Sequence, residues 1–140
     1  MSAGYSGTPL ARKLGIKPGM RVLTLGAPAG FPDLLEPLPD GVTLLTRSQK
    51  PADVIIAFAD TPAILRRRLD AAIAKLPADG GLWVAWPKKS AVPDTRLSFD
   101  VVQTRGLSLG LVDNKICAID DTWSGLRLVV RREDRAAWPR

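Results

Sequence analysis

Several apolar runs in this sequence end in residues that suit a small anionic ligand. Arginine and lysine donate charge-assisted hydrogen bonds to carboxylate and phosphate groups, and glycine lets the backbone come close to a ligand. The residues of these types that follow apolar runs are Gly26, Gly30, Arg47, Lys88 and Lys89. We predict that they form the rim of a small-anion site. The alternative for the two lysines is a charged loop in solvent.

Three more residues near the ends of apolar runs are candidates for the same region. Asp60 can act as a general base only if its surroundings raise the pKa of its carboxyl group. Trp86 either belongs to the core or forms a wall of the pocket, because indole rings bury a large area. Trp123 either anchors a partner chain or covers the edge of a sheet.

The counts of histidine and cysteine exclude many kinds of active site. The sequence has no histidine and one cysteine, Cys117. This excludes a Ser-His-Asp triad, a Cys-His pair, an intrachain disulfide and zinc held by histidines or by several thiolates. Cys117 is interpreted as a small buried side chain, with a reactive thiol as the alternative. Asp120 and Asp121 are adjacent acids in a turn, where exposure to solvent is common, so we predict no metal site.

A polar interruption falls inside a late strand-like run. Asp113, Asn114 and Lys115 stand between apolar residues on both sides. The pattern is typical of a β-bulge or of hydrogen bonds that fix a hairpin. The alternative is a charge pair, because residues two apart on a strand point to the same side.

The composition indicates one folded domain with a basic surface. The chain has 140 residues, of which 46% are hydrophobic and 24% charged, and a net charge of +6. This size suffices for one core, so we expect a single Rossmann-like domain over residues 1–135 and a tail over 136–140. We find no signal peptide and no run long enough for a membrane span, which predicts a cytoplasmic protein. The charge permits salt-sensitive binding to nucleic acid, but no aromatic and basic platform accompanies it.

Strand-like and helix-like segments alternate along the chain. The expected strands cover residues 21–25, 42–45, 53–58, 82–86, 110–119 and 125–131. The expected helices cover residues 9–14, 32–36, 62–76 and 94–104. Alternation of this kind predicts an α/β fold, a three-layer Rossmann-like and mostly parallel sheet with a C-terminal antiparallel hairpin. Ligands of such sheets bind at the carboxyl ends of the strands, which is where the rim residues stand.

Two segments carry a resemblance to a known family. Residues 14–26 read Leu-Gly-Ile-Lys-Pro-Gly-Met-Arg-Val-Leu-Thr-Leu-Gly, and residues 80–84 read Gly-Gly-Leu-Trp-Val. They resemble the approach to the first strand, and a Gly-Gly element before a later strand, in class I S-adenosylmethionine-dependent methyltransferases. The resemblance covers about residues 14–132. It implies a methyltransferase-like fold and S-adenosylmethionine as the cofactor.

Three residues depart from the pattern of that family. Thr24 stands where the family has an acidic residue, and Pro28 stands where it has the middle glycine of the first loop. Arg47 follows the second strand, where an acid holds the ribose in the family. Pro28 also lacks an amide donor and adds a ring. These departures make S-adenosylmethionine a possible but disfavoured cofactor.

Four further stretches resemble a small bacterial family known as a domain of unknown function. The stretches are residues 5–10, 81–88, 110–115 and 123–127. This resemblance implies no activity. We therefore expect a non-enzymatic Rossmann-like domain that binds a small anion or a protein partner. The alternatives are a reduced S-adenosylmethionine-dependent methyltransferase and, more weakly, a nucleic-acid-associated basic protein.

Overall fold

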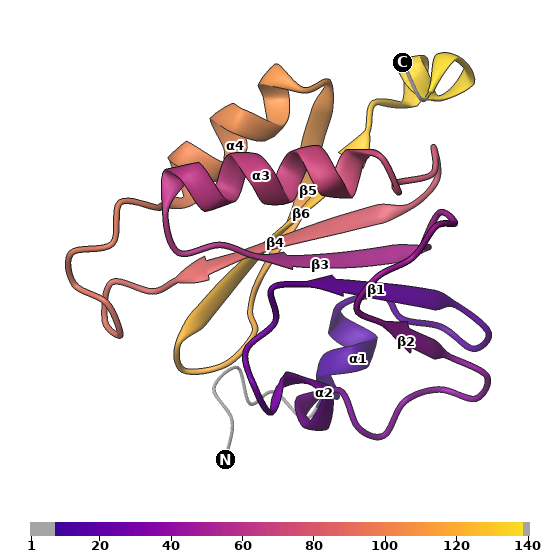
Figure 1. Cartoon of the computed structure of the whole chain (residues 1–140), viewed down its shortest axis with the longest axis horizontal. Coiled ribbons are helices and arrows are strands. Elements are labelled where there is room, and N and C mark those ends of the chain that lie inside the picture. The colour runs from indigo at the N-terminus through magenta and orange to yellow at the C-terminus, as the bar shows by residue number, and fades with distance from the viewer. Residues whose placement is uncertain (1–7, 139–140) are drawn as a thin grey trace.

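The computed structural model describes residues 8–138. It shows a six-stranded sheet between two layers of helices (Figure 1). The strands are β1 (Arg21–Leu25), β2 (Thr43–Leu45), β3 (Val54–Phe58), β4 (Gly81–Pro87), β5 (Leu111–Ala118) and β6 (Trp123–Val130). The helices are α1 (Leu10–Lys13), α2 (Phe31–Leu34), α3 (Pro62–Ile73), α4 (Phe99–Ser108) and the 3-10 helix η1 (Arg132–Ala137).

The strands follow the order β2-β1-β3-β4-β6-β5 across the sheet. The first four are parallel, and β6 runs antiparallel to both β4 and β5. In the register, Val22 pairs with Val54, and Ile55 pairs with Leu82. The predicted α/β fold with a parallel sheet and an antiparallel hairpin is confirmed. The carboxyl ends of β1, β3 and β4 therefore share one edge of the sheet.

Burial on both faces explains why β3 and β4 are the central strands. Every residue of both strands is buried, as their nearly continuous apolar sequences predict. One face packs against α3 and α4, and the other packs against α1 and α2 (Figure 1). Helix α3 turns the stripe Leu65, Leu69 and Ala72 toward the first of these faces, at the spacing of an amphipathic helix.

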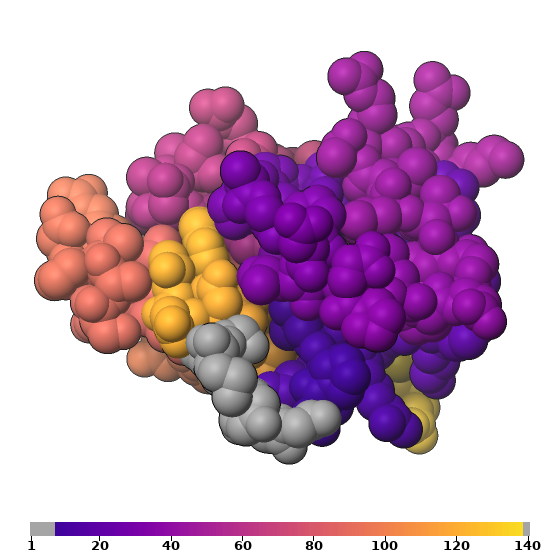
Figure 2. Space-filling view, turned by 90° about the horizontal axis from the view of Figure 1, so that it is seen from below, coloured from indigo at the N-terminus to yellow at the C-terminus, as the bar shows by residue number. Residues whose placement is uncertain are grey.

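Helix α4 begins later than the sequence pattern suggests. The expected start was residue 94, but the helix begins at Phe99 because Ser98 caps it: the Ser98 Oγ accepts a hydrogen bond from the Val101 amide at 3.3 Å. The segment before it, residues 88–98, is irregular. This segment projects from the molecule beyond the carboxyl ends of the parallel strands (Figure 2, salmon). The last strand begins at Trp123, two residues earlier than expected.

The connection from β2 to β3 contains no helix. Residues 46–53 cross β1 to reach the start of β3 (Figure 1). Arg21 fixes this crossover, because its guanidinium donates to the Ser48 Oγ at 2.7 Å and to the Pro51 carbonyl at 3.4 Å. The Asp53 carboxylate accepts from the Arg21 amide at 2.9 Å. Side-chain hydrogen bonds thus hold in place a segment that has no secondary structure of its own.

The last described residues are tied to the domain. The indole Nε1 of Trp138 donates to the carbonyl of Leu76 at 2.7 Å, beyond the end of α3. Trp138 also packs against the core on the α3 face. Among residues 8–138, every helix is too short or too polar to cross a membrane.

Candidate functional site

The loop after β1 lies at the carboxyl edge of the sheet and turns through two glycines. Gly26 has φ +68° and Gly30 has φ +85°. Both values lie in the left-handed region of backbone conformation, which residues with a Cβ rarely adopt. Gly30 stands directly before α2. Both glycines are exposed, whereas Ala27 and Pro28 between them are half-buried.

An arginine that the sequence analysis did not assign to the site lies over the first of these glycines. A Cβ built on Gly26 would clash with the Arg68 Nη2 and would lie 2.6 Å from the Arg68 Nε. The Arg68 Nε donates to the carbonyl of Phe58, the last residue of β3, at 3.0 Å. Arg68 therefore spans the ends of β1 and β3 from helix α3. Its guanidinium occupies the space that the missing Gly26 side chain leaves.

The spacing along α3 offered a signal for Arg68. Arg66, Arg67 and Arg68 together are interpreted from the sequence as a solvated helix face. Arg66 and Arg67 are exposed, as expected, but Arg68 is half-buried. It directly precedes Leu69 and follows Leu65 by three residues, so it flanks the apolar stripe of the helix. A long cation in that place can reach back over the sheet edge.

The other residues of the predicted rim stand at the ends of their strands. Arg47 follows β2, Asp60 follows β3, and Lys88 and Lys89 follow β4. Arg47, Asp60 and Lys89 are exposed and Lys88 is half-buried. The backbone amide of Lys88 donates to the carbonyl of Thr122 at 2.7 Å, which joins the end of β4 to the hairpin turn. The topology brings these residues to one edge, and their binding of a ligand stays a prediction.

A pocket opens at this edge beside the end of β3. It has a volume of about 600 Å³ and lies between the start of α3 and the irregular segment before α4. Asp60 and Thr61 line it from one side, and Asp94 and Thr95 from the other. Arg66 and Arg96 supply positive charge to the same walls. Of the predicted rim, only Asp60 is among the lining residues of this pocket.

Both candidate tryptophans contribute to the core. Trp86 is 5% exposed and packs on the face that α3 and α4 cover. Trp123 is half-buried and meets Phe58 edge to face, with ring centroids 5.1 Å apart. The Phe58 ring also meets Phe31, with centroids 4.9 Å apart. A role for Trp86 as a pocket wall, or for Trp123 as an anchor for a partner, stays a prediction.

Thr24, at the position of the family's acidic residue, has a structural partner. Its side chain is 5% exposed, and its Oγ1 donates to the carbonyl of Leu45 at 3.4 Å. The hydroxyl therefore links β1 to the end of β2 and does not reach the loop.

The polar interruption in β5 is a β-bulge, as one of the two interpretations predicted. The register shifts between Asp113 and Lys115. The Asp113 carboxylate accepts from the Gln103 amide at 3.0 Å, and the Lys115 Nζ donates to the Lys13 carbonyl at 2.9 Å. The two charged side chains therefore have separate partners, and the alternative interpretation, a charge pair, is wrong. Within residues 8–138, His, Cys, Asp and Glu side chains form no group of three that could hold a metal ion.

Several solved structures whose fold this chain shares are named as methyltransferases. The chain superposes on a DhpI–SAH complex with a TM-score of 0.60 and 13% identity, covering 89% of this chain and 83% of that one. The N-methyltransferase NodS from Bradyrhizobium japonicum gives a TM-score of 0.59 and 13% identity, with 85% and 90% covered. TrmN from Thermus thermophilus gives a TM-score of 0.54 at 16% identity. The match covers 86% of this chain but only 47% of TrmN. No protein-family model and no curated protein sequence matches the chain.

These comparisons correct one expectation from the sequence and support another. The expectation that the chain is not an enzyme is wrong, because the structures that share its fold include NodS and a ribosomal protein L11 methylase from Lactobacillus delbrueckii. The resemblance to a methyltransferase-like fold is confirmed. The resemblance to the small bacterial family stays a prediction. At identities of 10–16%, the similarity shows the fold alone.

Proposed function

We propose that this chain is a methyltransferase that binds an S-adenosyl compound at the carboxyl edge of its sheet. The observation that carries the proposal is the Arg68 guanidinium, held over Gly26 at the end of β1. Support comes from the shared fold, since structures of DhpI contain SAH and SAM. S-adenosylmethionine would supply an activated methyl group, and this chain would hold and orient it.

The residues at this edge fit a ligand that carries a carboxylate. The Arg68 Nε donates to the Phe58 carbonyl, and the Arg68 Nη2 lies over the Gly26 backbone. A guanidinium with its terminal N–H groups available suits a carboxylate, which it can bind with two parallel hydrogen bonds. The methionine part of S-adenosylmethionine carries such a group. The hydrogen bond to Phe58 orients the guanidinium before any ligand arrives.

Arg68 also compensates for the sequence departures in the loop. Pro28 removes one backbone amide that could contact a ligand, and Thr24 offers no charge. From helix α3, the Arg68 guanidinium supplies a hydrogen-bond donor at this loop in place of the amide that Pro28 lacks. The pocket beside Asp60, at the end of the next strand, provides space for the methyl acceptor.

Calorimetric titration with S-adenosylhomocysteine tests the proposal. The wild-type protein is expected to bind, and Arg68→Gln is expected to weaken binding about tenfold or more through the loss of a charge-assisted contact. Arg67→Gln is the matched control, because it makes the same change at the exposed neighbouring position, and it should alter the affinity less than about twofold. Absence of binding at about 1 mM ligand would overturn the proposal. Equal affinities of wild type and Arg68→Gln would remove Arg68 from the site.

A further inference from the structure

A second pocket lies at the opposite edge of the sheet, where the parallel strands begin. It has a volume of about 430 Å³, within the range of small-molecule sites. Its walls come from α1 and the loop after it, from the starts of β3 and β4, and from the β5–β6 hairpin. Val54, the first residue of β3, is one of the lining residues. The pocket is therefore separate from the carboxyl-edge site.

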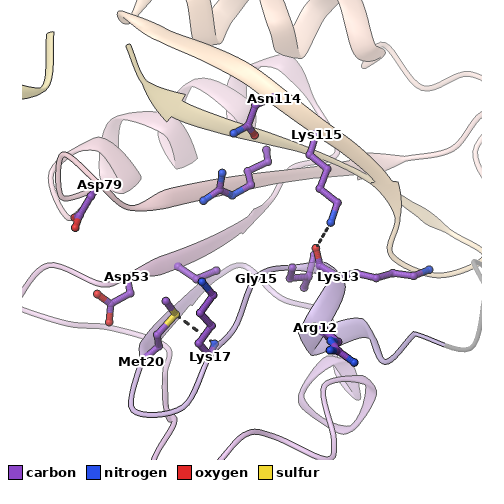
Figure 3. Close-up of a pocket in the computed structure, with 12 residues that line it drawn as sticks. Arg12, Lys13, Gly15, Lys17, Met20, Asp53, Asp79, Asn114 and Lys115 are labelled. Atoms are coloured by element: carbon purple, nitrogen blue, oxygen red, sulfur yellow. Dashed lines mark hydrogen bonds between the residues drawn. The ribbon is translucent and has the colours of Figure 1, made fainter. Parts of the chain in front are cut away.

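Positive charge dominates this pocket. Five cationic side chains line it, against two carboxylates. The cations are Arg12, Lys13, Lys17, Lys115 and Arg127. Figure 3 shows Asp53 and Asp79 together on one side, away from Lys115 and Arg12 on the other. The cations therefore outnumber the carboxylates, and Lys115 and Arg12 lie apart from both carboxylates.

Arg127 is the pocket residue that a bound anion would stabilise most. Its side chain is half-buried, and within the described part of the chain it makes no hydrogen bond or ion pair from its guanidinium. Burial lowers the pKa of Arg127, and the nearby charge of Arg135 lowers it further. A cation withdrawn from water without a partner is unfavourable. An anion in the pocket would remove that penalty.

A glycine at the start of β4 makes room for this guanidinium. A Cβ on Gly81 would lie 2.6 Å from both the Nε and the Nη2 of Arg127. The guanidinium therefore lies directly against the Gly81 backbone at the pocket wall. Arg127 pairs in register with Trp83 of β4, so it points to the same face as the Trp83 ring. That face carries α1, whose following loop forms the facing wall.

The β-bulge in β5 adds a second cation at a defined place. The register shift at Asn114 changes where the strand aims its side chains. Lys115 then reaches across the pocket, and its Nζ donates to the Lys13 carbonyl at the end of α1 (Figure 3). This bond joins the hairpin to α1 along one side of the pocket. The Asn114 side chain lines the same wall and can donate through its amide.

We propose that this amino-edge pocket binds a small phosphate-bearing ligand, with Arg127 as its main contact. A guanidinium matches the geometry of phosphate oxygens, and lysines add charge without fixed geometry. Two carboxylates in the lining disfavour a long polyanion and suit a compact ligand. The inference stands independently of the proposed methyltransferase activity. It uses none of the residues at the carboxyl edge.

Titration calorimetry with inorganic phosphate, at constant ionic strength set with chloride, tests this site. Saturable binding is expected below about 10 mM. Arg127→Met should weaken it about tenfold or more, because it removes the charge and keeps much of the side-chain length. Arg132→Met makes the same change at an exposed position of η1 and should change the affinity less than about twofold. Lys17→Met, at an exposed position of the pocket wall, should weaken binding about two- to fivefold and covers the case in which Arg127→Met does not fold.

Two results would overturn the proposal: no saturable binding of phosphate, or equal affinities of the wild-type and pocket variants. A parallel titration with phenyl phosphate distinguishes the source of the ligand. Tighter binding than inorganic phosphate indicates an organic monoester whose remainder enters the pocket, and equal binding indicates free phosphate. Arg68→Gln should leave phosphate binding unchanged, and Arg127→Met should leave S-adenosylhomocysteine binding unchanged. Failure of one proposal can thus be told from failure of the other.

Discussion

The indole Nε1 of Trp83 donates a hydrogen bond of 3.0 Å to the carbonyl of Leu14. Trp83 is in the middle of β4 and fully buried, and Leu14 stands at the end of α1. This bond ties the first helix to the central strand. It also fixes the part of the chain from which Arg12, Lys13 and Lys17 reach the amino-edge pocket.

Replacing Trp83 by Phe should therefore destabilise the protein by about 2–4 kcal/mol. The change leaves the Leu14 carbonyl without its buried donor and removes part of a fully buried ring. Urea unfolding followed by circular dichroism measures the effect. Trp86→Phe is the comparison: Trp86 is almost as buried, but within the described residues its ring nitrogen has no hydrogen-bond partner. Equal losses in the two variants would show that the Leu14 bond adds nothing.

Replacing Arg21 by Met should loosen the crossover between β2 and β3. The variant loses the hydrogen bonds to Ser48 and Pro51, and the expected loss of stability is about 1–2 kcal/mol. Hydrogen exchange should become faster in residues 46–53, which have no helix to protect them. Arg47→Met changes an exposed residue of the same segment and should leave the exchange rates unchanged. Unaltered exchange in the Arg21 variant would contradict the role given to this side chain.

Replacing Thr61 by Ala should weaken the start of α3. The Thr61 Oγ1 accepts a hydrogen bond from the Ile64 amide at 3.1 Å, and loss of such a cap costs about 0.5–2 kcal/mol. Thr61→Ser keeps the hydroxyl and should retain most of the stability. Because α3 carries Arg68, the Ala variant should also bind S-adenosylhomocysteine more weakly than the Ser variant. Indistinguishable thermal unfolding of the two variants would exclude the cap.

Cys117 gives an expected dependence of stability on pH. Burial raises the pKa of its thiol above the ordinary value of 9.0, and this outweighs the opposite effect of Lys13 and Lys115. The neutral thiol is therefore favoured in the folded state. Its contribution is fully present below about pH 9 and is lost as the pH rises through the folded-state pKa.

Urea unfolding at about pH 8 and about pH 10.5 tests this dependence. The wild-type protein should lose more stability between the two values than Cys117→Ala does. The native thiol should also react slowly with iodoacetamide at neutral pH, since the thiolate is the nucleophile. Parallel losses in the two proteins, or rapid alkylation of the native thiol, would contradict the raised pKa.

The central strands were predictable from sequence because their surroundings are uniform. β3 and β4 are buried on both faces, so apolar residues at every position identify them. The start of α4 was misplaced because the Thr95 Oγ1 accepts a hydrogen bond from the Leu97 amide outside the helix, and the Ser98 cap decides where the helix begins. Turn-forming and cap-forming residues look alike in a sequence.

The two features that define the proposed sites depend on contacts between distant segments. Arg68 lies over Gly26 only because α3 packs across the ends of β1 and β3. Arg127 and Gly81 meet only because β6 pairs with β4 in one particular register. Glycine was visible in both places in the sequence, but the arginine that fills each space was not. Sequence patterns locate the sheet edges; the packing decides which cations reach them.

The position of β4 in the sheet has a consequence for how the protein is made. All seven of its residues are buried, and its partner on one side, β6, is synthesised only after α4 and β5. On the ribosome, the nascent chain therefore carries an apolar strand with an open edge until the hairpin emerges. Such edges pair readily with other chains. We therefore expect the chain to be most prone to aggregation before β6 has been synthesised.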